Sequence, residues 1–296
     1  MTLENCLRQG INTLQSNNVS DADFDAFALL EYVTGVSKSD FFFKKSDETS
    51  DSCYERYIEL IERRSKRVPL QHITNRQNFF GYDFYVDSNV LIPRQDTEVL
   101  IEKILEVIEA NFNVEISSDI SILDMCTGSG CIAITIYKEL IKRGFNIDVT
   151  AVDLSKDALA VTEKNVENVV GIKALNNTFH IIESDMFSNI NNNRSYDIIV
   201  SNPPYIPTRD IEKLEPEVRD YDPIMALDGD TDGLRFYRRI IEESSNYLNN
   251  NGFIAFEIGY NQGDDVKSLL EEKGYKDIHI YKDLGGLDRV IIGRNN

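Results

Sequence analysis

The sequence contains few of the residues from which metal centres and disulfide scaffolds are built. Its 296 residues include four cysteines, Cys6, Cys53, Cys126 and Cys131, and no two of them form a CxxC pair. The three histidines are far apart in the sequence and none lies near a cysteine. This spacing excludes the common metal-ligand patterns. We therefore expect no metal site and four free thiols in a reducing compartment.

Long apolar runs and an excess of positive charge are also missing. No run approaches the roughly 20 residues of a transmembrane helix, and the first residues show no signal-peptide pattern. We therefore expect a cytoplasmic protein without a membrane partner. The 50 acidic residues outnumber the 31 lysines and arginines, which gives a formal net charge of -19. Because proteins that bind polynucleotides usually carry a basic face, this balance argues against nucleic acid as a direct partner.

The first 75 residues have the pattern of a small helical bundle. Apolar residues recur at helical spacing in three stretches, which begin near Leu3, Phe24 and Tyr54. We interpret residues 1–75 as a domain that docks a substrate. The third stretch ends in four cations, Arg63, Arg64, Lys66 and Arg67. They suit the negative end of a helix and favour a solvated surface, and the alternative is that they contact an acidic partner.

Residues 76–92 read as a linker with a β-hairpin. The pattern predicts strands over 79–86 and 90–92 with a turn at 87–89, and we expect the aromatic side chains to fill a seam between domains. A helix is predicted from about Thr97 to Ala110, with Asp96 as its cap. Arg94 precedes it, and either contacts a cofactor carboxylate or forms a structural salt bridge.

From Ser121 onward, strand and helix patterns alternate. This alternation predicts an α/β fold with a mostly parallel sheet and helices on both faces. A closing hairpin at Gly285-Gly286 would make the last strand antiparallel. The expected strands are 121–126, 148–154, 179–184, 196–201, 252–258, 277–281 and 289–292, and the expected helices are 132–143, 156–169, 234–248 and 263–273.

The first of these strands leads into a glycine-rich loop, Cys126-Thr127-Gly128-Ser129-Gly130, that opens a helix. Glycines let a ligand approach the backbone, and a helix start offers unpaired N–H groups. The next strand ends at Asp153, which can hold a ribose diol, although it could instead cap the following helix. After the third strand, Asp185 can accept from an adenine amine and Phe187 can stack on its ring. These strand ends predict an adenosyl cofactor.

The strand over 196–201 ends in Asn202-Pro203-Pro204-Tyr205. The Asn202 side-chain oxygen and the Pro203 carbonyl can each accept a hydrogen from one planar NH2 group, because proline keeps its acceptor. Pro204 stiffens the turn, and Tyr205 can lie flat against a conjugated group. Asn-Pro-Pro alone is an ordinary turn. Beside an adenosyl cofactor, however, this tetrapeptide predicts methyl transfer to a held nitrogen.

Taken together, these motifs resemble those of the release-factor glutamine N5-methyltransferases. The likeness adds Pro69-Leu70-Gln71, the stretch 91–98 (LIPRQDTE) and Glu257-Ile258-Gly259, and it runs nearly end to end. It implies a Rossmann-like, seven-stranded methyltransferase domain over 93–296, with S-adenosyl-L-methionine as cofactor and a monomeric state. The implied protein substrates are peptide chain release factors 1 and 2, methylated on the glutamine of their Gly-Gly-Gln motif.

The resemblance also assigns roles to individual residues. Cofactor binding falls to the loop 126–130, Asp153, Asp185, Phe187 and Asn202; substrate binding falls to Asn202, Pro203, Pro204 and Tyr205; catalysis falls to Asn202, Pro203 and Tyr205. The family usually has glycine where this chain has Cys126. A cysteine is compatible with the loop if its φ stays below zero, and otherwise weakens cofactor binding.

Three other functions fit parts of the pattern. A DNA adenine N6-methyltransferase uses the same four-residue turn on a flipped base, but the charge of -19 opposes it. A binding module would keep the cofactor pocket without catalysis. A nicotinamide dehydrogenase shares the loop and the acid but has no use for Asn202–Tyr205. The acidic stretch 206–232 is long for a connection, and is either a lid over the substrate or a solvated loop.

Overall fold

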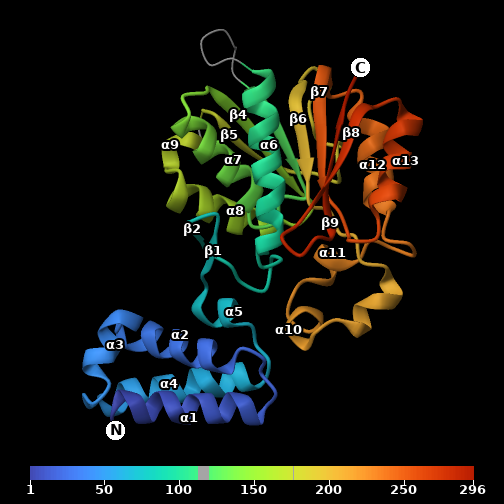
Figure 1. Ribbon diagram of the computed structural model, residues 1–296. Coiled ribbons are helices and arrows are strands. Elements are labelled where there is room, and N and C mark those ends of the chain that lie inside the picture. The colour runs from blue at the N-terminus through green and yellow to red at the C-terminus, as the bar shows by residue number, and fades with distance from the viewer. Residues whose placement is uncertain (113–119, 176) are drawn as a thin grey trace. The chain divides into compact units, whose positions relative to one another are not determined.

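The computed structural model describes residues 1–112, 120–175 and 177–296 (Figure 1). The chain divides into two compact units. The helical unit contains Met1–Arg76 and the short segment Glu215–Tyr221, and the α/β unit contains Gln77–Leu214 and Asp222–Asn296. The middle of the acidic stretch 206–232 therefore groups with the helical unit, although both of its ends belong to the α/β unit.

The helical unit is built from α1 (Leu3–Ser16), α2 (Ala22–Thr34), α3 (Lys38–Lys44), α4 (Asp51–Ser65) and α5 (Leu70–Thr74). Its core includes Leu14, Leu29 and Leu60, which are fully buried. Serine and threonine caps begin three of the helices, where Thr2, Ser37 and Ser50 each accept from a backbone N–H. The sequence patterns missed α3, because its Phe42 and Phe43 point to solvent and leave no apolar stripe.

The cations at the end of α4 are not simply solvated, and that interpretation was wrong for two of them. Arg64 is 5% exposed and donates to Asp25 Oδ2 at 2.6 Å and to Glu217 Oε1 at 3.0 Å. Arg67 donates to both carboxylate oxygens of Glu217, at 2.6 and 2.5 Å. The acidic partner of these arginines is thus the segment Glu215–Tyr221 of the same chain.

The hairpin is shorter than predicted and turns earlier. β1 (Gln77–Phe79) pairs with β2 (Tyr82–Phe84) around Phe80 and Gly81, both of which have positive φ. Residues 90–92 form no strand. Phe79 and Phe84 are buried in the core of the α/β unit, so the expected seam between domains was also wrong. The aromatic-rich run 79–86 indicated strand structure correctly, but the turn was placed at the more polar residues 87–89.

The α/β unit is built around a seven-stranded sheet of order β5-β4-β3-β6-β7-β9-β8. The strands β3 to β7 run parallel, and β9 runs antiparallel to both of its neighbours, as expected for a closing hairpin. The strands are β3 (Ile120–Met125), β4 (Ile147–Asp153), β5 (Phe179–Glu183), β6 (Tyr196–Ser201), β7 (Leu248–Glu257), β8 (Lys276–Lys282) and β9 (Asp288–Arg294).

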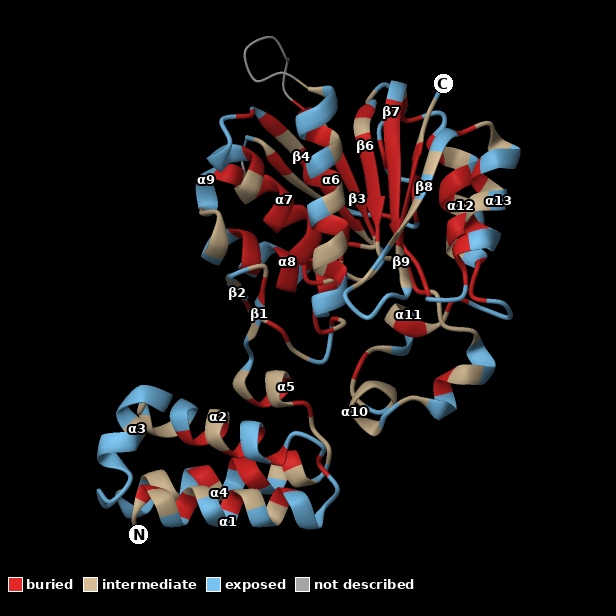
Figure 2. Ribbon diagram, viewed as in Figure 1, coloured by how far each residue is buried: buried red, intermediate tan, exposed pale blue. Residues whose placement is uncertain are grey.

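Helices cover both faces of this sheet (Figure 1). Neighbouring residues of β3 alternate between two cores, with Ile122 packed under α6, α7 and α8, and Leu123 packed under α12 and α13. The inner strands are mostly buried, whereas the outermost strand β8 is largely exposed (Figure 2). The helices are α6 (Glu98–Asn111), α7 (Cys131–Lys142), α8 (Lys156–Val169), α9 (Ile172–Leu175), α12 (Arg235–Ser244) and α13 (Gly263–Lys273). The predicted α/β class is confirmed.

The strand order creates a crevice at the carboxyl ends of the strands, next to β3. The chain runs outward from β3 to β4 and β5, and then returns to place β6 on the other side of β3. Ligands of open α/β sheets bind at such a reversal, outside the carboxyl ends of the strands. The predicted site residues follow β3, β4, β5 and β6, so the topology brings their strand ends to one edge.

The stretch 206–232 is ordered into short elements: η2 (Thr208–Lys213), α10 (Pro216–Arg219) and α11 (Ile224–Leu227). Another short helix, η1 (Gln95–Thr97), leads into α6. Asp96 lies inside η1. The sequence predicted it as the cap of α6, and that prediction was wrong. Within the described ranges, no helix combines the length and the apolar character that a membrane span requires.

Candidate functional site

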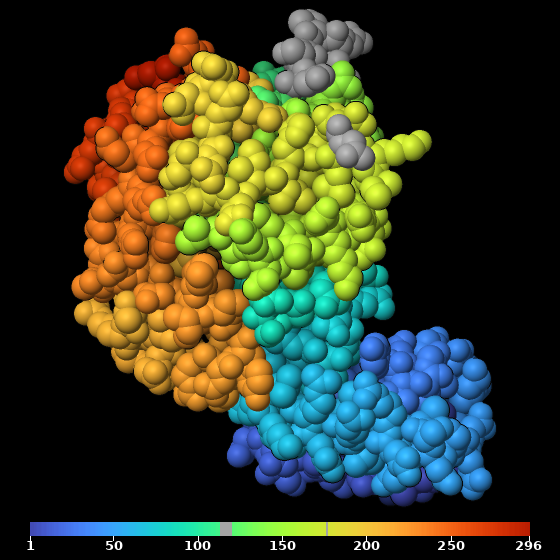
Figure 3. Space-filling model, turned by 180° about the vertical axis from the view of Figure 1, so that it is seen from behind, coloured from blue at the N-terminus to red at the C-terminus, as the bar shows by residue number. Residues whose placement is uncertain are grey.

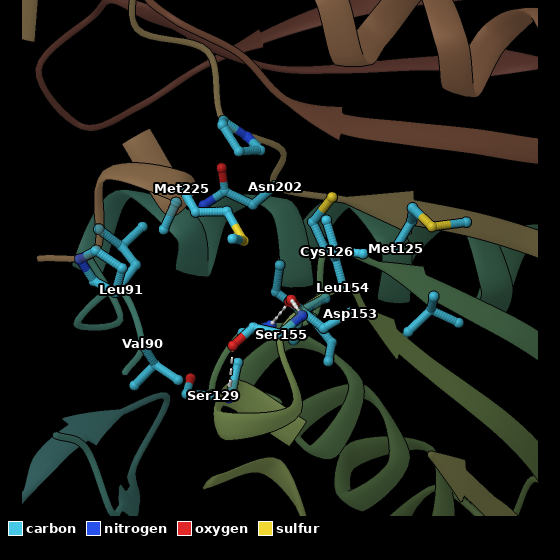
Figure 4. A pocket seen from close by; sticks show the side chains of 18 of the residues that line it. Val90, Leu91, Met125, Cys126, Ser129, Asp153, Leu154, Ser155, Asn202 and Met225 are labelled. Atoms are coloured by element: carbon cyan, nitrogen blue, oxygen red, sulfur yellow. Dashed lines mark hydrogen bonds between the residues drawn. The ribbon is translucent and has the colours of Figure 1, made fainter. Parts of the chain in front are cut away.

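A cavity lies at the carboxyl edge of β3, β4, β5 and β6 (Figure 4). Asn202 and Met225 lie across this cavity from Asp153 and Ser155, with Val90 and Leu91 at one end. Most of the predicted site residues contribute to its wall, namely Cys126, Thr127, Gly128, Ser129, Asp153, Asp185, Asn202 and Pro204. Gly130, Phe187, Pro203 and Tyr205 lie outside the lining.

The glycine-rich loop is fastened at several points. The Gly128 N–H donates to Asp153 Oδ2 at 2.9 Å, and the Thr127 hydroxyl donates to the buried Asp124 at 2.6 Å. At Gly130 a side chain would meet Thr162 Cγ2 at 2.8 Å, so this glycine lets the loop pack against α8. Gly128, in contrast, has a φ of +56° and open space at the position of a side chain. A ligand can therefore approach the backbone at Gly128.

Cys126 does not keep a negative φ. Its φ is +62°, in the left-handed region that costs an L-residue about 1–2 kcal/mol relative to right-handed backbone. The condition for an unstrained cysteine at this position is therefore not met. Burial and the neighbouring carboxylates of Asp153 and Asp124 also raise the pKa of the Cys126 thiol. The thiol stays protonated, and it lines the cavity as a small apolar group.

Asp153 ends β4 and engages two backbone groups. Its Oδ2 accepts from Gly128, and its Oδ1 accepts from the Ser155 N–H at 2.9 Å. The cap of α8 is Ser155, whose hydroxyl accepts from Ala158. Burial raises the pKa of Asp153, and the hydrogen bonds from Ser155 and Gly128 oppose that shift. Each carboxylate oxygen keeps a further lone pair, so Asp153 can still accept from hydroxyl groups in the cavity.

The turn after β5 offers different residues from those expected. Phe187 is 2% exposed and stacks on Tyr247 in the core, with ring centroids 4.6 Å apart. The structure does not bring its ring to the cavity, where Ser184, Asp185 and Met186 form the wall instead. Asp185 also accepts from Arg239 Nη1 at 2.8 Å. Met186, directly before Phe187, has a φ of +52°.

Asn202 follows β6, and a chain of polar contacts lies behind it. Its Nδ2 lies 3.5 Å from the Thr97 hydroxyl, which in turn donates to Glu257 Oε2 at 2.5 Å. The Tyr205 hydroxyl donates to the other oxygen, Oε1, at 3.2 Å. Glu257 is 2% exposed. Its burial raises its pKa, against the opposing effects of the Thr97 hydrogen bond and the charge of Arg289.

Part of the acidic stretch 206–232 closes one side of the cavity. Pro223, Met225 and Ala226 belong to the lining. The guanidinium of Arg94 donates to Asp222 Oδ2 at 2.8 Å, which is the structural salt bridge that was one of the two interpretations of Arg94. Arg94 also lines the cavity. In the space-filling view, orange atoms of this stretch lie against blue-green atoms that follow the hairpin (Figure 3). The side chain of Asp222 is fully buried, so the interpretation of 206–232 as a solvated loop does not hold for this residue.

Sequence reasoning gave no role to several of these residues. Thr97 and Glu257 lie within the stretches that carry the resemblance, 91–98 and 257–259, yet no motif rule attaches a chemistry to either residue type there. A buried glutamate at the end of a predicted apolar strand was the available signal, since such a group needs hydrogen-bond donors. Met225 carried no signal, because single apolar residues in a loop are common. Leu91 begins the stretch 91–98, but no motif rule gave it a role.

Comparisons with known proteins point in one direction. Residues 5–74 match the family model described as PrmC N-terminal domain, and residues 97–214 match the Methyltransferase small domain. The release factor glutamine methyltransferase of Clostridium acetobutylicum is 36% identical over 293 residues, 99% of this chain and 98% of that protein. Its namesake from Geobacter sulfurreducens is 40% identical over 235 residues, which cover 79% of this chain and 76% of the relative.

Among solved structures, a human methyltransferase 10 domain containing protein has a TM-score of 0.51 at 18% identity, covering 73% of this chain and 89% of that one. This likeness concerns the fold alone and agrees with the class I methyltransferase architecture of the sheet.

Proposed function

The chain belongs to the family of release factor glutamine methyltransferases, and from that premise we propose how its site performs the reaction. It is an S-adenosylmethionine-dependent enzyme that methylates the side-chain amide nitrogen of glutamine in release factors. The DNA adenine N6-methyltransferase alternative finds no support among the relatives. The observation that carries the proposal is the placement of Asn202 and Asp153 on opposite sides of one cavity.

The residues present fit an adenosyl cofactor. The open backbone at Gly128 admits the amino-acid part of the ligand, and the lone pairs of Asp153 suit a ribose diol. The wall formed by Ser184, Asp185 and Met186 takes the place that the sequence had given to Phe187 beside the adenine. The cofactor, when bound, supplies an electrophilic methyl carbon on a positively charged sulfur.

The tetrapeptide Asn202–Tyr205 holds the other reactant. Asn202 Oδ1 and the Pro203 carbonyl accept the two hydrogens of the glutamine amide, which directs the nitrogen lone pair at the methyl carbon. Tyr205 is anchored through its hydroxyl to Glu257, and this bond fixes its ring. The nitrogen held by Asn202 and Pro203 would take the methyl carbon of a bound cofactor as the bond from that carbon to sulfur breaks, and the surplus proton on nitrogen would pass to solvent. Positioning supplies much of the acceleration, because an amide nitrogen is a weak nucleophile.

The finer assignments are part of the proposal. The substrate glutamine is that of the Gly-Gly-Gln motif in release factors 1 and 2, and the enzyme acts as a cytoplasmic monomer without binding nucleic acid. Residues 1–75 dock the release factor, residues 76–92 connect, and residues 93–296 carry the chemistry. Two features support this division: the family model for the N-terminal domain ends at residue 74, and every residue of the cavity lies in the α/β unit.

Mass spectrometry of a purified release factor tests the proposal. Incubation with this enzyme and S-adenosylmethionine should add one methyl group to the glutamine of the Gly-Gly-Gln peptide. The Asn202→Ala variant should lose turnover while it still binds the cofactor, because the acceptor of the glutamine amide is gone. Near-normal methylation by that variant contradicts the role of Asn202. A methyl group on another residue, or on duplex DNA supplied in parallel, contradicts the substrate.

A further inference from the structure

We propose that Thr97 and Glu257 are positioning residues that fix the orientation of the Asn202 side-chain amide, so that its oxygen faces the cavity. The inference rests on the function proposed above and extends it to Thr97, which lines the cavity, and to Glu257, which does not. The side-chain amide of an asparagine can adopt two orientations. An asparagine amide has an acceptor on one side and a donor on the other, and a rotation of 180° exchanges them at little cost unless a neighbour distinguishes the two.

Glu257 supplies the distinction. Its carboxylate is buried at the end of β7, and both of its oxygens accept from hydroxyl groups, Oε2 from Thr97 and Oε1 from Tyr205. A hydroxyl has a single hydrogen to donate. Because Thr97 commits that hydrogen to a buried carboxylate at 2.5 Å, its oxygen is left only to accept from the next group.

The next group is Asn202. Its Nδ2 lies 3.5 Å from the Thr97 oxygen, at the long end of a hydrogen bond. If the amide rotated, its oxygen would face a hydroxyl oxygen that has no hydrogen to offer, and two acceptors would repel each other. The network therefore holds the NH2 group of Asn202 against Thr97 and leaves Oδ1 free to accept from another group; both residues contribute to the cavity lining.

This orientation decides what the site can hold. With Oδ1 toward the cavity, Asn202 accepts from a substrate NH2 group, as methyl transfer to an amide nitrogen requires. With the amide reversed, two NH2 groups would meet donor to donor. The same carboxylate also anchors Tyr205, so Glu257 fixes the first and last residues of the tetrapeptide.

Two substitutions at one position separate positioning from packing. Thr97→Val keeps the shape of the side chain and removes the hydroxyl, whereas Thr97→Ser keeps the hydroxyl and removes a methyl group. The Val variant should lose kcat by on the order of 100-fold, as for a misplaced reactant, with cofactor affinity within about twofold of wild type. The Ser variant should recover most of that loss. Thr150→Val is a matched control, because Thr150 is also fully buried and bonded to a side-chain hydroxyl, that of Tyr196.

The assay measures methylation of a release factor, with kcat and KM determined separately and cofactor binding followed by calorimetry. The inference is overturned if Thr97→Val retains more than half of the wild-type kcat, if Thr97→Ser is as impaired as Thr97→Val, or if cofactor affinity falls in parallel with kcat. Should Thr97→Val not fold, Thr97→Ala removes the same hydroxyl and carries the same expectation, and an unaltered kcat in that variant overturns the inference. A wild-type enzyme without methylation would refute the proposed function itself, and the inference with it.

Discussion

Cys126 is a non-glycine residue held at a φ of +62° in the glycine-rich loop that lines the cavity. Glycine at this position relieves about 1–2 kcal/mol of strain, offset by about 0.5–1 kcal/mol of additional entropy in the unfolded chain. We therefore expect Cys126→Gly to equal or slightly exceed wild type in its free energy of unfolding. Cys126→Val, with a β-branched side chain, should lose about 1–2 kcal/mol relative to Cys126→Gly.

Denaturant unfolding of the three proteins gives the free energies, and titration with S-adenosylmethionine gives the affinities. Both should follow the order Gly, Cys, Val. A valine variant as stable as the glycine variant would show that the loop relaxes out of the left-handed region.

Asp222 is a buried carboxylate that is paired with the guanidinium of Arg94. Burial raises its pKa to about 6, against the opposing charge of Arg94. Because the folded-state pKa lies above that of the unfolded chain, the contribution of Asp222 to stability is present below about pH 4 and is lost as the pH rises through about 6. The loss is on the order of 3 kcal/mol.

The test compares wild type with Asp222→Asn, which cannot titrate. The free energy of unfolding, measured from pH 4 to pH 8, should fall in wild type relative to the variant across this window, and the difference should be constant above about pH 7. Parallel curves for the two proteins would mean that Asp222 does not change its proton affinity on folding.

At the scale of elements, the end of the stretch 206–232 packs backbone against backbone on the tetrapeptide. A side chain at Gly229 would meet the Tyr205 Cα and the Gly233 Cα, each at 2.8 Å, and the Pro204 carbonyl oxygen at 2.9 Å. Backbone atoms cannot yield as a flexible side chain can. We expect Gly229→Ala to displace the corner at Pro204 and Tyr205, and to lower turnover on the order of 100-fold at a stability cost of about 1–3 kcal/mol.

Gly293 in β9 provides the control for Gly229. Its nearest contacts would lie at 3.4 Å or more from an added Cβ atom, and its φ is not positive. Gly293→Ala should therefore keep wild-type turnover. Equal activity of Gly229→Ala and Gly293→Ala would exclude a close fit between this stretch and the tetrapeptide.

Local sequence patterns predicted the strands and helices but not the contacts between distant residues. Strand and helix periodicity placed the sheet well, because buried parallel strands such as β6 are apolar runs that end abruptly at turn residues. The sequence could not reveal that Met186 takes a positive φ or that Phe187 stacks on Tyr247 in the core. It also could not pair Thr97 with Glu257, which lie 160 positions apart in the chain. Such contacts depend on tertiary packing rather than on local pattern.

At the scale of the whole molecule, the segment Glu215–Tyr221 connects the stretch 206–232 to the helical unit. Glu217 is partly buried, which raises its pKa, but hydrogen bonds from Arg67 and Arg64 bring the pKa below its ordinary value. Its contribution to stability is therefore present above about pH 4.5 and is lost as the pH falls through the lower folded-state pKa. These contacts fasten the segment.

We expect Arg67→Ala to loosen this segment. Hydrogen exchange followed by mass spectrometry should show faster exchange over Glu215–Tyr221, since Arg67 makes the bidentate contact to Glu217. The control is Arg56→Ala. Arg56 forms an exposed ion pair with Glu59 within α4, and such pairs contribute little to the free energy of unfolding. Unchanged exchange in Arg67→Ala would mean that other contacts hold the segment.

The reversal of strand order between β3 and β6 has a consequence for how such enzymes diversify. The residues proposed to bind the methyl donor mainly follow β3, β4 and β5, on one half of the sheet, whereas the tetrapeptide proposed to hold the acceptor follows β6, on the other half. Under the proposed roles, a substitution at Pro203, Pro204 or Tyr205 changes the contacts to the acceptor nitrogen and leaves the residues after β3, β4 and β5 as they are. Donor and acceptor contacts are thus encoded in separate strand ends of one sheet.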